Sequence, residues 1–112
     1  MTLLLSALVG CQSPQARARC DPKNAGYERI FAEEPNNPLA RACRGDRDAL
    51  HHYFSQALDH TLDGERSEGL AHLISIIRGY IGDRAFFAAL SQEAAEIQHA
   101  MKAYLYLRPR GT

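Results

Sequence analysis

The chain lacks a charge excess of either sign, because its 13 basic residues balance its 13 acidic residues. Proteins that bind nucleic acid by general electrostatic attraction are usually basic, so this balance argues against a nucleic-acid partner. The chain also lacks a long apolar run. The run at residues 3–9 is far shorter than the ~20 apolar residues that a membrane-spanning helix needs.

Sequence motifs for the common catalytic sites are missing as well. The chain contains no G-x-S-x-G, P-loop or HExxH pattern, and no CxxC pair that would suggest a zinc site. Two acidic pairs are spaced three apart, Glu65/Glu68 and Glu93/Glu96, but each falls in an expected first helical turn. Acidic side chains there stabilise the helix dipole. We therefore expect a protein that is not an enzyme and that has no cofactor and no bound metal.

The apolar run at residues 3–9 leads directly into Leu8-Val9-Gly10-Cys11. This stretch resembles a bacterial lipobox, at which a signal peptide is removed and the new N-terminal cysteine is acylated. The run has the size of the apolar region of a secretory signal, so residues 1–10 are interpreted as a signal peptide. Only Met1 and Thr2 precede the run, where a signal normally carries Lys or Arg, and we therefore expect the natural start to lie further upstream.

The resemblance implies an envelope lipoprotein anchored through lipid on Cys11. Such proteins carry more than one acyl chain, which gives stable anchoring where a single chain binds only marginally. Gln12 follows the cysteine, whereas an aspartate there marks retention in the inner membrane of enterobacteria. The expected location is therefore the outer membrane, on its periplasmic side.

Lipidation of Cys11 would leave Cys20 and Cys43 as an even pair in an oxidising compartment. Thiols in such a compartment are usually bridged, so we expect a Cys20–Cys43 disulfide. The bridge would close a loop rich in proline, glycine and asparagine and contribute roughly 3 kcal/mol in the chain-entropy model.

The hydrophobic pattern predicts an all-α fold, a small antiparallel bundle of four to five helices behind a flexible lipidated tether. Residues 11–23 are assigned to the tether and 24–112 to the helical domain. Residues 24–45 are expected to be irregular with short helices near 25–34 and 38–43, and the main helices to lie within 46–107. The residues expected to cap or stop the main helices are Asp46, Asp63, Gly64, Ser67, Gly82, Asp83 and Ser91.

A weak internal echo leaves a second arrangement open. Gly45-Asp46-Arg47 recurs as Gly82-Asp83-Arg84, an offset that suits a repeat of helical hairpins. The alternative is that each Gly-Asp pair only stops one helix and caps the next.

The leading functional interpretation is a non-enzymatic binding or accessory module for another envelope protein. In size, anchor and helicity the chain resembles secretion-system pilotins, which bind a helix of an outer-membrane channel subunit. A second interpretation is an immunity or inhibitor lipoprotein that neutralises a periplasmic toxin. Tyr106 is the candidate contact residue, because it faces away from the apolar stripe that Tyr104 continues, and tyrosine is enriched at binding hot spots.

The histidines offer an alternative from another class. His60 and His72 would meet across the turn at Asp63-Gly64 and hold a metal ion, with Asp59 or Asp63 nearby. A small metal-dependent hydrolase centred on these two histidines is the resulting alternative.

Overall fold

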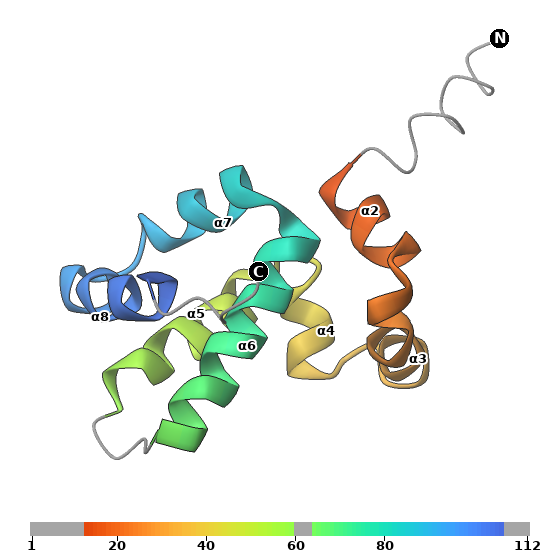
Figure 1. Cartoon of the computed structure of the whole chain (residues 1–112). Helices are drawn as coiled ribbons and strands as arrows, with labels where there is room; N and C mark the ends of the chain where they lie inside the picture. The colour runs from red at the N-terminus through yellow and green to blue at the C-terminus, as the bar shows by residue number, and fades with distance from the viewer. Residues whose placement is uncertain (1–12, 60–63, 107–112) are drawn as a thin grey trace, which may run out of the picture.

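The structure, a computed structural model, describes residues 13–59 and 64–106 (Figure 1). This part of the chain contains helices and no strand, which confirms the all-α fold. Cys11, Gln12, His60 and Asp63 lie outside the described residues. The helices, in chain order, are α2 Pro14–Cys20, η1 Pro22–Asn24, α3 Ala25–Glu33, α4 Pro38–Ala42, α5 Arg47–Ser55, η2 Gln56–Leu58, α6 Gly64–Ile81, α7 Asp83–Leu90 and α8 Ala95–Tyr106.

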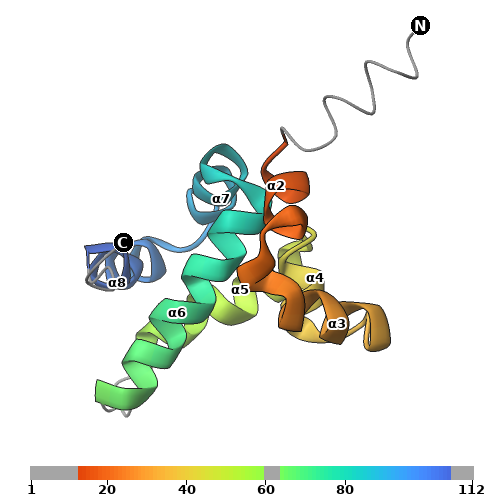
Figure 2. The same cartoon turned by 45° about the vertical axis from the view of Figure 1, so that its right-hand side comes forward.

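The long helix α6 runs through the middle of the domain, and the other helices pack around it (Figure 2). The centre of the core is formed by Phe54, Ile77, Phe86 and Met101, one residue each from α5, α6, α7 and α8, and all are fully buried. Phe54 and Phe86 meet edge to face, with ring centroids 5.4 Å apart. Burying a side chain of this size stabilises the fold by roughly 1.5–3 kcal/mol, so these four residues hold the C-terminal helices together.

The segment assigned to a flexible tether is helical from Pro14 onward, so that prediction was wrong there. The Ser13 side chain accepts a hydrogen bond from the Ala16 backbone N–H at 3.1 Å, and Pro14 occupies the first turn. Proline is tolerated at this position because its missing N–H would have no helical partner. Helix α2 packs along α6 with Ala18 buried. Its alternating Ala and Arg residues looked like linker, but the small Ala18 side chain allows close contact with α6.

The turn before α5 matches the expectation, while the ends of several other helices differ. Asp46 caps α5 by accepting from the Ala49 N–H at 3.0 Å. Helix α5 ends at Ser55 and continues only as η2, instead of reaching Asp63-Gly64. Ser67 lies inside α6 and does not begin it. Ser91 ends α7 and does not cap α8, which begins at Ala95.

Turn geometry accounts for the Gly-Asp echo. Gly45 and Gly82 both take a left-handed φ, +88° and +86°, a conformation that favours glycine. The aspartates then differ, because Asp46 is the N-cap residue of its helix, whereas Asp83 lies in the first turn of α7 after the N-cap residue Gly82. Asp83 instead pairs with Arg78 at the end of α6, with Arg78 Nε 2.7 Å from Asp83 Oδ1. The shared motif therefore marks two turns with different side-chain roles.

Candidate functional site

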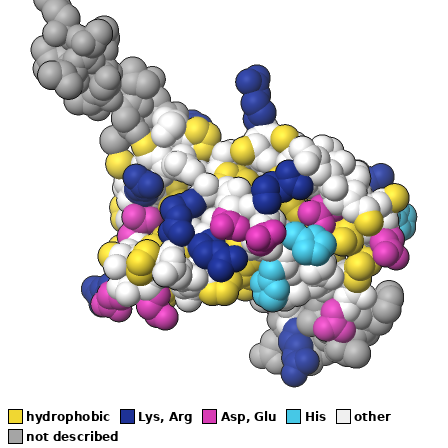
Figure 3. All heavy atoms as spheres, turned by 180° about the vertical axis from the view of Figure 1, so that it is seen from behind, with side chains coloured by type: hydrophobic (Ala, Val, Ile, Leu, Met, Phe, Trp, Pro, Cys, Tyr) yellow, Lys and Arg dark blue, Asp and Glu magenta, His cyan; other side chains and the backbone are white. Residues whose placement is uncertain are grey.

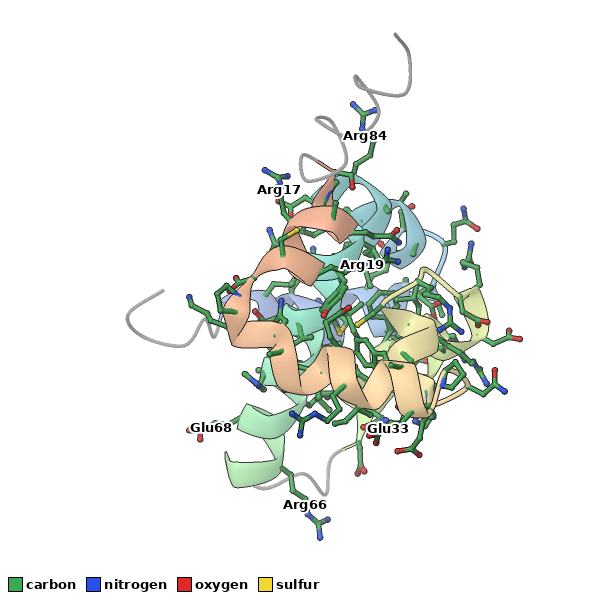
Figure 4. All side chains as sticks on the ribbon, turned by 90° about the vertical axis from the view of Figure 1, so that its right-hand side faces the viewer. Arg17, Arg19, Glu33, Arg66, Glu68 and Arg84 are labelled. Carbon is green, nitrogen blue, oxygen red and sulfur yellow. The ribbon has the colours of Figure 1, made fainter. Side chains whose placement is uncertain are left out.

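A cavity of about 280 Å³ lies between α2, α3, α4 and α6 and opens to solvent. Figure 4 looks onto this side of the molecule. Helices α3 and α4 form close to their expected positions, and α2 completes the wall. The residues that give the cavity its chemical character are Arg19, Glu28, Phe31, Cys43, Arg44 and Tyr80.

The aromatic wall of the cavity joins α3 to α6. Phe31 and Tyr80 meet edge to face, with ring centroids 5.6 Å apart. Tyr80 is only 3% exposed, and its hydroxyl donates a hydrogen bond to Glu28 Oε2 at 2.5 Å. Glu28 and Phe31 lie three residues apart and so share one face of α3. Both side chains therefore meet Tyr80 together, and they hold α3 against the core.

Burial sets the protonation state of Tyr80. Removal of its hydroxyl from water raises the pKa of Tyr80 far above its ordinary value, and the hydrogen bond to Glu28 raises it further. The hydroxyl therefore stays neutral and acts as a donor at physiological pH. Glu28 is the acceptor and brings a negative charge to the cavity wall.

Cys43 contributes a buried thiol to the same cavity. It is 3% exposed, and its burial raises its pKa to about 12, with the charge of Glu28 adding to the effect. The nucleophilic form of cysteine is the thiolate, so this thiol is chemically inert at neutral pH. The spacing of the cysteines in the sequence did not predict that Cys43 is buried at the cavity wall.

The expected Cys20–Cys43 disulfide is not formed in the structure. Cys43 packs in the core beside α4, whereas Cys20 is exposed at the end of α2. The prediction used only the even number of cysteines, which does not determine where α2 and α4 place the two side chains. A bridge requires both Cβ atoms to approach within about 4.5 Å.

The rim of the cavity carries the exposed side chains of Arg19 and Arg44. The charge of Arg19 acts on Tyr80, whose pKa it lowers slightly against the larger raising effects. The guanidinium groups carry positive charge at the opening, whereas the Glu28 carboxylate, which accepts from Tyr80, lies on the wall. The cavity therefore combines an aromatic wall that holds one carboxylate with a cationic rim.

The histidines are dispersed over the described surface. His72 lies 3.2 Å from the Tyr27 hydroxyl, and His51 lies 2.6 Å from Glu93. Among residues 13–59 and 64–106, no three His, Cys, Asp or Glu side chains gather as metal ligands. The proposed partner of His72, His60, lies outside the described residues. One face of the molecule mixes basic, acidic and histidine side chains without separating them (Figure 3).

Two candidate residues from the sequence fall where the structure describes no side chain. Tyr106 is the last residue of α8, but its side chain is outside the described part, and so is the acylation candidate Cys11. Tyr104 is half-buried against the core, as its place on the apolar stripe predicts. Of the cavity residues, Cys43 was a sequence candidate, but only for a disulfide. Glu28 and Tyr80 were not candidates, because they are separated by 52 positions.

The chain matches no protein-family model, and neither a curated protein nor a solved structure shows significant similarity to it. Among the described residues, no helix combines the length and the apolar character needed to cross a membrane.

Proposed function

We propose that this protein is an envelope lipoprotein, acylated on Cys11, whose helical domain binds a protein partner without catalysing a reaction. The lipobox-like Leu8-Val9-Gly10-Cys11 supports the anchor. The cavity between α2, α3, α4 and α6 supports the binding role. The domain would be held at the outer membrane, facing the periplasm, in the manner of a pilotin.

The cavity itself is the observation that carries the binding role. Its volume is just below the range for small-molecule sites, about 300–1,000 Å³, which suits one large side chain of a partner. Phe31 and Tyr80 offer aromatic surface to an apolar group, and Arg19 and Arg44 offer charge to an adjacent carboxylate. Aromatic and arginine residues dominate the energetics of protein interfaces.

The partner segment is therefore expected to present an apolar anchor side chain next to an acidic residue. A helix of another envelope protein has this chemistry when both residues lie one turn apart. An immunity role would use the same cavity against a toxin, so the identity of the bound protein separates the two cases.

A photo-crosslinking experiment in intact cells tests the cavity as the binding site. A photoreactive amino acid replaces Ala32, which lines the cavity, or Lys102, which is exposed on α8. We expect one protein of defined mass to be captured from position 32 and not from position 102. When Arg44→Glu is added to the protein with the photoreactive residue at position 32, capture should fall while the melting temperature stays unchanged. Capture of the same protein from both positions, or none from position 32, would contradict the assignment.

A further inference from the structure

We propose that the end of the domain where α2 begins rests on an anionic phospholipid surface, through Arg17, Arg84 and Phe87. This inference rests on the proposed acylation of Cys11. It adds an orientation: one defined surface of the domain faces the bilayer, and the cavity opening is held at a fixed place relative to it.

The length of chain between the anchor and the domain brings this surface to the membrane. Cys11 precedes Ser13 by two residues, which span at most ~7 Å. Ser13 is the N-cap residue of α2, so the helix begins directly after it. A lipid anchor on Cys11 therefore cannot hold the start of α2 far from the headgroups.

Helix α2 is fixed to the rest of the domain at the same end. It packs along α6, and Pro14 lies against Gly82 in the turn between α6 and α7. A Cβ atom at Gly82 would come within 2.7 Å of Pro14 Cγ. The anchor point therefore carries the α6–α7 turn with it to the bilayer.

The surface at this end is basic. Arg17 and Arg84 are exposed and point away from the domain at the end where α2 begins (Figure 4). Neither forms an ion pair with another described residue. Arg78, which lines a cleft together with Arg17, is paired with Asp83. Arg17 and Arg84 are thus available to anionic headgroups, which attract basic residues within about a Debye length.

The same end also exposes an apolar ring. Phe87 is 40% exposed and lies one helical turn after Arg84, on the same side of α7. Arg78 stacks on it, with Cζ 5.0 Å from the ring centroid. A basic face with an exposed phenylalanine is the pattern by which helices bind at the membrane interface.

An open cleft of about 430 Å³ lies at the same end of the domain, beside Arg17 and Arg78. It is lined by Pro14, Arg17, Arg78, Gly79, Gly82 and Asp83. A headgroup phosphate entering it would meet the guanidinium groups of Arg17 and Arg78, with the Asp83 carboxylate opposing. Contact is therefore expected to depend on charge and on the closeness of the anchor, and the unanchored chain should bind weakly.

Tryptophan fluorescence tests the orientation, because the natural sequence contains no tryptophan. Phe87→Trp places a single reporter in the surface, and Glu68→Trp places one toward the opposite end of the domain (Figure 4). The full acylated chain is reconstituted in vesicles of phosphatidylcholine and phosphatidylglycerol that include brominated lipid. We expect blue-shifted, quenched emission from Phe87→Trp and unquenched emission from Glu68→Trp. Arg84→Trp is a second reporter should Phe87→Trp lower the melting temperature.

Charge reversal provides the matched control. In the Phe87→Trp background, Arg84→Glu should reduce quenching in the anionic vesicles, whereas Arg66→Glu, toward the far end, should leave it unchanged. The difference between the two should vanish in pure phosphatidylcholine vesicles. Equal quenching of both reporters, or equal effects of both reversals, would overturn the inference.

Flotation separates this inference from the proposed function. A chain that is acylated and floats with vesicles, but whose Phe87→Trp emission is unquenched, refutes the membrane-facing surface and leaves the anchor intact. A chain that takes up no lipid on Cys11 refutes the anchor, and the orientation fails with it.

Discussion

Tyr80 of α6 donates a hydrogen bond to Glu28 of α3, and this bond links the N-terminal third of the chain to the central helix. Phe31 packs against the same tyrosine ring from the next turn of α3. Helix α3 itself contains no fully buried residue. Besides the exposed contact between Tyr27 and His72, these two contacts hold α3 on α6, and the shape of the cavity depends on the position of α3.

Removing the Tyr80 hydroxyl should loosen α3. Tyr80→Phe keeps the ring and deletes the donor, so we expect the free energy of unfolding to fall by about 1.5–3 kcal/mol, as for a hydrogen bond to a charged group. Urea titration followed by circular dichroism measures the change. Tyr27→Phe is the control, because the Tyr27 hydroxyl meets only exposed His72. If both variants lose the same free energy of unfolding, the hydrogen bond between Tyr80 and Glu28 stabilises the fold no more than the exposed contact of Tyr27.

Gly82 should tolerate a side chain less well than Gly45. Both have φ near +87°, so alanine at either position is strained by about 1–3 kcal/mol. Only at Gly82 does the new Cβ also strike Pro14, at 2.7 Å, while nothing lies within 4 Å at Gly45. Gly82→Ala should therefore displace α2 and speed tryptic cleavage after Arg17 and Arg19, whereas Gly45→Ala should not. Equal cleavage rates would mean that α2 does not depend on this contact.

Cys43 should make the fold sensitive to alkaline pH. Its pKa is about 12 in the folded protein against 9.0 ordinarily, so the folded state keeps the proton that the unfolded chain releases. The associated stability is complete below pH 9 and is lost as the pH rises from 9 toward 12, by at most about 1.4 kcal/mol per pH unit. Urea unfolding is measured in steps of about one pH unit, from about pH 8 to about pH 11. The free energy of unfolding should fall less over this range for Cys43→Ala than for the wild type. Burial raises the pKa values of Tyr53 and Tyr80 in both proteins, and the charge of Cys43 raises them further in the wild type alone, so this contribution also makes the wild-type loss the larger one. Parallel curves would show that Cys43 ionises freely when folded.

Features that depend on residues close together in the sequence could be predicted. The Asp46 cap, the left-handed Gly82 that ends α6 and the half-buried Tyr104 on the apolar stripe of α8 follow from local patterns. Helix α2 could not be predicted in this way, because seven residues form a marginal helix until α6 covers Ala18. Hydrophobic periodicity alone groups Phe87 with Phe86 on the apolar face of α7, but Phe87 is exposed, since α7 is short and its neighbours cover only the side of Phe86.

The cavity could not be predicted either, because it depends on contacts between residues far apart in the sequence. Its wall is formed by Glu28 and Tyr80, whose contact spans 52 positions, and hydrophobic periodicity carries no information on pairing between distant helices. The same limit explains the cysteines. Their number suggested a bridge, while the environment of Cys43 is decided by the packing of α4 on α5 and α6.

The lipid anchor gives the last prediction, and it decides the proposed location. Cells grown with radioactive palmitate should label the wild-type chain and Cys20→Ser, and should not label Cys11→Ser. Each substitution removes one thiol, and the two positions are nine apart in the sequence. A difference in labelling between the two variants therefore assigns the lipid to the residue that follows Gly10. Uncut Cys11→Ser should also migrate more slowly, because its signal peptide remains attached. Equal labelling of both variants would place the acyl chain elsewhere and remove the basis for an envelope lipoprotein.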